Sequence, residues 1–270
     1  MEPRLQGILD EVRQAGGRVV ALTGAGISAE SGIPTFRGAE GYWVVGSRNY
    51  IPQEMATQRM FQAAPEEVWR WYLYRFGVCR HAQPNAGHAA LARLEQALGE
   101  RFTLVTQNID GLHRRAGSER VHCIHGDAAW VRCSDECGVG LLPLPEFPVR
   151  TKDDVITAED RRRLSCPRCE AWLRPHVLWF DEYYDEENYR MESALAAAHA
   201  ADLLLVVGTS GATNLPMQIG QLAYVNGTAL VDVNPDLNPF AELAQRSKRG
   251  FFAQGSATAR LPEIAAALGA

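Results

Sequence analysis

The sequence predicts an α/β fold in which a doubly wound parallel sheet carries two inserts. Short apolar, β-branched runs recur along the chain, at 18–22, 102–106, 203–207 and 228–233. Helical patterns precede them, most clearly at 88–98 and 191–200. Apolar strands that alternate with helices are typical of a parallel sheet covered by helices on both faces. The first run also leads into a glycine-bearing turn at Gly24-Ala25-Gly26, as a buried strand does where it passes into a loop.

Elements and inserts follow in chain order. An amphipathic helix is expected over 5–14, and a short strand over 120–124. Two stretches break the alternation: about 35–79 is aromatic and helical in pattern, and about 127–173 lacks sustained apolar periodicity. We interpret both as inserts, so a Rossmann-like domain would comprise, within one unit, about 1–34, 80–126 and 174–270.

Composition and charge exclude several classes of protein. The chain has 270 residues, with 27 Lys and Arg against 32 Asp and Glu, a net charge of −5. This balance disfavours direct binding to nucleic acid. The N-terminus lacks the pattern of a signal peptide, and no apolar run approaches the roughly 18 residues of a membrane span. We therefore expect a cytoplasmic protein with reduced thiols and no membrane partner.

Four of the six cysteines form two close pairs, Cys133-x3-Cys137 and Cys166-x2-Cys169, separated by 28 residues. Four thiolates can close a tetrahedral zinc site that leaves no position open for catalysis. The alternative is four buried thiols without a metal. The polar string CSDEC around the first pair favours one structural Zn²⁺ per chain.

The glycine turn continues as a glycine-rich, polar segment over 24–38. Free backbone N–H groups after a strand can bind a pyrophosphate. The segment lacks the third glycine of the common dinucleotide fingerprint, because Ala29 occupies that position. A turn without a ligand would look similar at its start, but the length of the segment favours a loop shaped around a ligand.

Seven separated motifs then give the chain a family resemblance. They are GAGIS at 24–28 with IPTFR at 33–37, TQNIDGLH at 106–113, HG at 125–126, the two cysteine pairs, RPHV with WF at 174–180, GTS at 208–210, and VN at 233–234. In this order they resemble the sirtuin family of NAD-dependent protein lysine deacylases, over about residues 18–260. The resemblance implies NAD as co-substrate and acyl-lysine proteins or peptides as partners.

The resemblance also implies which residues form the site. His125, in the HG motif, is the expected general base, which a neutral imidazole can be near neutral pH. The other six histidines are expected to be structural. For the TQNID segment the alternative is a cluster that caps a helix. The residues expected to bind NAD are Gly24, Ala25, Gly26, Ser28, Phe36, Arg37, Gln107, Asn108, Ile109, Asp110, Gly208, Thr209, Ser210, Asn234 and Ala257.

In the family, the acyl-lysine carbonyl oxygen attacks the nicotinamide ribose and expels nicotinamide. The histidine then helps to deprotonate a ribose hydroxyl. The implied products are free lysine, nicotinamide and O-acyl-ADP-ribose.

Tyr72 and Arg75 stand at i, i+3 and should share a helix face. A Tyr-x-x-Arg at this place resembles the sirtuins that remove acidic acyl groups, since a guanidinium and a hydroxyl can hold a distal carboxylate. Succinyl- and malonyl-lysine are thus favoured over acetyl-lysine. The alternatives are a core tyrosine with a solvated arginine, or a register that uses Arg70 and Tyr74. The remaining expected substrate contacts are Ala56, Val177 and Phe180.

Three segments depart from the family pattern. Asp181 replaces a glycine and opens an acidic string, Cys123 stands where a glutamate is usual, and 211–216 reads GATNLP. The acidic string either attracts basic peptides or is a solvated surface. Two other functions share the same pocket: transfer of ADP-ribose to a protein side chain, and sensing of NAD or ADP-ribose without turnover.

Overall fold

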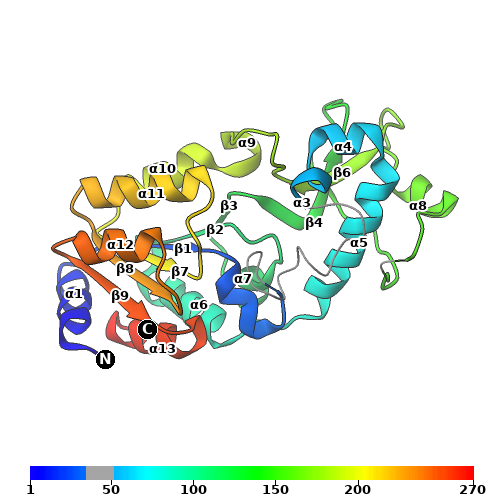
Figure 1. The fold of residues 1–270 in the computed structure, drawn as a ribbon. Helices are drawn as coiled ribbons and strands as arrows, with labels where there is room; N and C mark the ends of the chain where they lie inside the picture. The colour runs from blue at the N-terminus through cyan, green and yellow to red at the C-terminus, as the bar shows by residue number, and fades with distance from the viewer. Residues whose placement is uncertain (35–51, 152) are drawn as a thin grey trace.

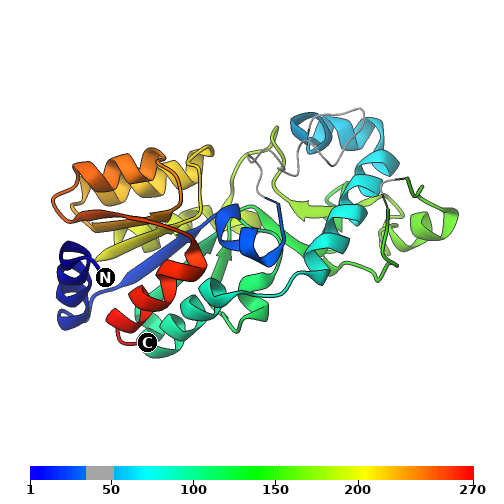
Figure 2. The same ribbon diagram turned by 60° about the horizontal axis from the view of Figure 1, so that its bottom comes forward.

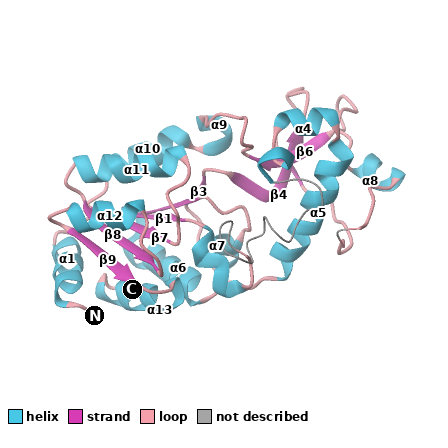
Figure 3. Ribbon diagram, viewed as in Figure 1, coloured by secondary structure: helices cyan, strands magenta, loops and turns pink. Residues whose placement is uncertain are grey.

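A computed structural model describes residues 1–34, 52–151 and 153–270. Its larger part is built on a six-stranded, wholly parallel sheet in the order β3-β2-β1-β7-β8-β9 (Figures 1 and 3). The strands are β1 (Val19–Thr23), β2 (Phe102–Thr106), β3 (Val121–Cys123), β7 (Leu203–Val207), β8 (Ala229–Asn234) and β9 (Gly250–Gln254). β2 and β3 lie on one side of β1, and β7, β8 and β9 lie on its other side, so the strand order reverses at β1. Folds of this kind bind ligands at the point of reversal.

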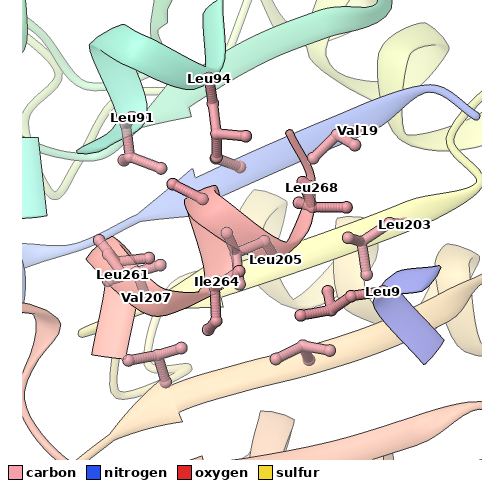
Figure 4. Close-up of a cluster of buried hydrophobic side chains, with 14 of the residues drawn as sticks. Leu9, Val19, Leu91, Leu94, Leu203, Leu205, Val207, Leu261, Ile264 and Leu268 are labelled. Atoms are coloured by element: carbon pink, nitrogen blue, oxygen red, sulfur yellow. The ribbon is translucent and has the colours of Figure 1, made fainter. Parts of the chain in front are cut away.

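Helices cover both faces of this sheet (Figure 2). One face packs against α1 (Pro3–Gln14), α6 (Ala86–Leu98) and α13 (Ala257–Ala267). The other packs against α10 (Met191–His199), α11 (Asn214–Val225) and α12 (Pro239–Arg246). Val19 and Val20 alternate between these two cores, as successive strand residues must. Figure 4 shows Leu9, Leu91, Leu203 and Ile264 meeting in the first core.

The smaller part combines an antiparallel sheet with helices. The sheet has the order β5-β4-β6, from β4 (Gly126–Cys133), β5 (Leu142–Pro143) and β6 (Leu173–Val177). The helices are α3 (Pro52–Met55), α4 (Gln58–Ala63), α5 (Pro65–His81) and α8 (Ala158–Arg163). The Trp69 indole on α5 donates a 2.7 Å hydrogen bond to the Leu173 carbonyl of β6. The two inserts therefore share one core, although they are far apart in sequence.

The remaining elements are short. η1 (Ala25–Ser31) follows β1 and α9 (Glu186–Tyr189) comes after β6, where the chain passes between the two parts. η2 (Gly99–Arg101) precedes β2 and α7 (Leu112–Arg115) follows it, within the larger part. No described helix is both long and apolar enough to cross a bilayer.

The predicted fold class is confirmed, with differences at the edges of the inserts. We expected the Rossmann-like domain to resume at 174, but β6 pairs with β4 in the smaller sheet. The helix of the first insert also extends beyond 79, to His81. The antiparallel strands escaped sequence analysis because their residues do not alternate: all five residues of β6 are buried.

Candidate active site and metal centre

Three glycines allow the loops that follow β1 and β7 to approach each other closely. A Cβ on Gly24 would lie 2.7 Å from the Thr209 Cβ, and one on Gly26 would lie 2.6 Å from the Gly208 Cα. Gly208 has φ +59°, a conformation that favours glycine. The glycines predicted at 24, 26 and 208 therefore form one backbone cradle, where the loops after β1 and β7 meet.

Polar side chains at the ends of three strands complete this edge of the sheet. Gln107 Nε2 donates to Thr209 Oγ1 at 2.8 Å, and Thr213 Oγ1 donates to Gln107 Oε1 at 3.1 Å. Asn234 Nδ2 donates to the Thr209 carbonyl at 3.0 Å. The expected contacts from β2, β7 and β8 are thus brought together. Ser210, beside them, is exposed.

A second polar cluster lies where the loop after β2 meets η1. Ser28 Oγ donates a 2.7 Å hydrogen bond to Asp110 Oδ2, and Asn108 Nδ2 donates to Ser28 Oγ at 3.2 Å. Asp110 Oδ1 accepts from the Leu112 amide at 2.9 Å, which anchors α7. Burial raises the pKa of the Asp110 carboxyl, and the bonds from Leu112 and Ser28 oppose the rise. Asp110 thus accepts from the first residue of α7, although the N-cap residue of that helix is Gly111. The binding of NAD by this cluster stays a prediction.

Buried histidines that sequence analysis treated as merely structural support this cluster from below. His113 Nε2 lies 2.9 Å from Thr23 Oγ1, and His88 Nε2 lies 3.4 Å from Ser28 Oγ. The two rings are 4.9 Å apart. Burial lowers the pKa of His88 to about 4 and that of His113 to about 3, so both rings are neutral at pH 7. A signal was present for His113, which is the last residue of the TQNIDGLH motif, but not for His88, which lies outside every predicted motif.

His125 lies between the two parts of the molecule. It stands two residues after the end of β3, and Gly126 begins β4 with φ +88°. A Cβ on Gly126 would lie 2.0 Å from the His176 carbonyl oxygen, so only glycine allows β4 and β6 to meet beside His125. Burial lowers the pKa of His125 to about 4, although the Gln107 carbonyl accepts a hydrogen bond from the ring. The imidazole is therefore neutral near pH 7, as a general base must be.

The His125 ring has a partner that sequence analysis missed. The Tyr184 hydroxyl lies 2.8 Å from Nε2 of His125. Tyr184 belongs to the acidic, aromatic string that begins at Asp181, and nothing in a single sequence indicates which tyrosine of such a string faces inward.

The expected acyl-binding residues line the smaller part. Tyr72 is 1% exposed and its hydroxyl accepts a 2.9 Å hydrogen bond from Trp179 Nε1. Burial raises the pKa of Tyr72 to about 12, and the nearby charge of Arg75 opposes this rise. The Arg75 guanidinium lies 4.3 Å over the centre of the Trp71 ring. Tyr72 and Arg75 therefore lie close together on α5.

The other predicted residues are dispersed around this centre. The Phe180 amide donates to the Ala56 carbonyl at 3.0 Å, and the Phe180 ring is 57% exposed. Val177 is buried at the end of β6, opposite Gly126. The Ile109 carbonyl accepts from the Ala128 amide at 2.9 Å. Ala25 is the first residue of η1, and Ala257, nearly buried, is the first of α13. Phe36 and Arg37 lie outside the described residues.

The acidic string is engaged within the chain. The Asp181 carboxylate accepts from the amides of Gln58 and Arg59, at 2.7 and 3.1 Å. Glu182 pairs with Arg174 and, at 3.3 Å, with Arg132. Asp185 caps α9. These bonds hold the loop in place, while Asp181 and Glu187 stay exposed to solvent. An attraction of this string for basic peptides stays a prediction.

The four paired cysteines meet in space. Their sulfur atoms all lie within 4.8 Å of one another, with Cys133 and Cys169 at 3.4 Å and Cys137 and Cys166 at 3.5 Å. Four Zn–S bonds of about 2.3 Å in a tetrahedron would set the sulfur atoms roughly 3.8 Å apart. The donor set therefore fits a structural zinc ion. The Cys166 amide, bonded to the Ala171 carbonyl at 2.7 Å, closes the second turn of the site.

A Rossmann-like sheet with a glycine cradle, joined to a four-cysteine insert, defines a class of nucleotide-binding α/β proteins with a zinc module. The chain belongs to the Sir2 family, whose profile matches residues 24–214. It is 42% identical over 243 residues to an NAD-dependent protein deacylase of Thermus thermophilus, covering 89% of this chain and 88% of the relative. It is 38% identical over 247 residues to an NAD-dependent protein deacylase of Leptospira interrogans, covering 92% and 91%.

Solved structures show the same fold. A Sir2 homologue in complex with NAD superposes with a TM-score of 0.80 at 33% identity, covering 99% of this chain and 94% of the other. A complex of Sir2 with a p53 peptide and NAD⁺ gives 0.72 at 27% identity, covering 98% and 96%.

Proposed function

We propose that the chain is an NAD-dependent protein lysine deacylase that releases free lysine, nicotinamide and O-acyl-ADP-ribose. The observation that carries the proposal is a neutral imidazole, His125, beside the polar residues that end β2. Family membership and the names of the relatives support it.

NAD, when bound, supplies the ribose carbon to which the acyl oxygen is transferred with loss of nicotinamide. The backbone N–H groups of Gly24, Gly26 and Gly208 donate to carbonyl groups within the chain. These glycines therefore hold together the loops after β1 and β7, beside which the phosphates would lie. Asn108 and Asp110 present amide and carboxyl groups that can hold the ribose and the carboxamide. His125 Nε2 takes the ribose proton, and burial keeps that nitrogen unprotonated beforehand.

We further propose that acyl groups with a distal carboxylate, succinyl and malonyl, are preferred over acetyl. Tyr72 accepts its hydrogen bond from Trp179, which leaves the phenol proton available for a carboxylate. Arg75 lies near enough to influence the pKa of Tyr72 and adds a positive charge. An acetyl group offers nothing for either residue to hold.

The experiment is a side-by-side assay of acetyl-, malonyl-, succinyl- and long-chain acyl-lysine peptides with NAD, followed by mass spectrometry. Acyl loss with matching O-acyl-ADP-ribose is the expected result, fastest for succinyl or malonyl peptides. ADP-ribosylated protein would instead identify a transferase. An absence of nicotinamide release with every peptide would favour a sensor of NAD or ADP-ribose.

A further inference from the structure

The Tyr184 hydroxyl lies 2.8 Å from Nε2 of His125, and the ring centres are 5.8 Å apart. The direction of this hydrogen bond follows from the neighbours of the two groups. The Gln107 backbone raises the pKa of His125, as a carbonyl does that faces a ring N–H, and since a carbonyl can only accept, we assign the ring proton to the nitrogen that faces it. Since Nε2 faces Tyr184, Nδ1 serves the carbonyl and carries the single proton of the neutral ring. Nε2 is thus a bare acceptor, and the Tyr184 hydroxyl donates to it.

Tyr184 keeps its proton over the working pH range. Burial raises the pKa of its hydroxyl to about 12. The lone pair that must accept the ribose proton is therefore already occupied by a neutral O–H donor.

The loop fixes Tyr184 in this position from both sides. Before it, Asp181 is bonded to the first turn of α4 and Glu182 is paired with Arg174. After it, Asp185 accepts from the Asn188 amide at 2.6 Å and caps α9. The adjacent Tyr183 is 90% exposed, so the backbone turns one tyrosine outward and the other toward His125.

We propose that Tyr184 is a positioning residue for the general base: it holds His125 in the Nδ1–H tautomer in the free protein and yields Nε2 to a ribose hydroxyl of NAD. The inference rests on the proposed function for the identity of the incoming hydroxyl. Binding of NAD then includes the cost of breaking the bond between Tyr184 and His125.

The first test measures His125 in the free protein. Protein labelled with ¹⁵N in histidine is compared with Tyr184→Phe, which keeps the ring and removes the hydroxyl; His125→Gln assigns the signals. We expect one tautomer with an unprotonated, hydrogen-bonded Nε2, and a downfield shift of Nε2 in Tyr184→Phe. Tyr183→Phe, the matched control, should leave the signal unmoved. An Nε2 signal equal in wild type and Tyr184→Phe would overturn the proposal.

The second test is calorimetric titration with NAD. Loss of one competing neutral hydrogen bond should make Tyr184→Phe bind NAD roughly two- to tenfold more tightly, with Tyr183→Phe unchanged. Unchanged or weaker binding would contradict the handover, weaker binding because Tyr184 would then contact NAD itself. If no acyl peptide were turned over, the proposed function would be wrong. The NMR comparison would still show whether Tyr184 donates a hydrogen bond to His125.

Discussion

Trp179 and Tyr72 lie 107 residues apart, and the indole nitrogen of the first donates a 2.9 Å hydrogen bond to the hydroxyl of the second. Both side chains are almost fully buried, so this bond joins α5 to the loop after β6 inside the smaller core. The bond orients the phenol of Tyr72, and it couples the proposed acyl pocket to the loop that carries Phe180 and Tyr184.

Tyr72→Phe should therefore destabilise the protein. The substitution leaves the Trp179 N–H buried without its acceptor, which costs about 1–3 kcal/mol of unfolding free energy. Urea unfolding measures the loss. Tyr74→Phe, on the same helix but only half-buried, should cost less than Tyr72→Phe. A Tyr72→Phe protein as stable as the wild type would mean that the bond to Trp179 contributes nothing.

Arg75→Met should reduce turnover of succinyl peptides much more than that of acetyl peptides. A charge-assisted bond to a carboxylate contributes about 1.5–3 kcal/mol, or roughly ten- to a hundredfold in kcat/KM. Acetyl turnover should change by no more than about twofold, since no carboxylate is lost.

Arg70→Met is the matched control for Arg75→Met. Arg70 pairs with Glu67 at 3.4 Å on the same helix and represents the alternative register. If Arg70→Met impaired succinyl turnover and Arg75→Met did not, the carboxylate site would have to move by one helical turn. Equal losses on both acyl groups would eliminate a carboxylate-specific role.

Removal of zinc should abolish activity without touching the reacting groups. Cys133, one of the four cysteines that fit a zinc ion, ends β4, and the same strand begins at Gly126, beside His125. Loss of the metal should unfold the β4–β6 sheet and release the base from its place. Cys166→Ser should lose bound zinc and activity together, as metal analysis and circular dichroism would show.

Cys79→Ser provides the comparison for the zinc variant, because Cys79 lies outside the four-cysteine group. It should retain one zinc per chain and its activity. A Cys166→Ser protein that kept full zinc content would show that the four sulfur atoms do not hold the metal.

Sequence reasoning succeeded where one strand carries its own signal. β2 and β7 were predicted at their observed bounds, because a run such as LLLVV is buried on both faces of a parallel sheet. The spacing of the four cysteines likewise predicted that they meet at one site, as they do in the structure. It failed for β4 and β6, whose partners lie far away in sequence and whose mixed residues show no period.

The site was predictable only where a motif names the residue. Gly24 and Gln107 stand in such motifs and meet near Thr209 in the structure. The contact of Tyr184 with His125 depends on how a loop is pinned at both ends, which is a tertiary property. The same holds for His88 and His113, whose tilted rings lie 4.9 Å apart near Ser28 because α6 and α7 converge there.

The buried pair His88 and His113 should make stability fall in mild acid. Each imidazole has a pKa near 6.5 when unfolded and a lower one when folded, about 4 and about 3. The unfolded chain therefore binds more protons below about pH 6.5. Their contribution is full above that pH and is lost as the pH falls toward 4. At about pH 5.5 each buried histidine should cost on the order of 1 kcal/mol.

Urea unfolding at about pH 7.5 and about pH 5.5 measures this change in free energy. Zinc release also responds to acid, so variants must separate the two effects. His113→Asn removes one titrating ring and should reduce the difference between the two pH values. His199→Gln, at an exposed site, should leave the difference unchanged because that ring is hydrated in both states. A His113→Asn protein with the full wild-type difference would show that His113 does not contribute to the loss of stability in acid.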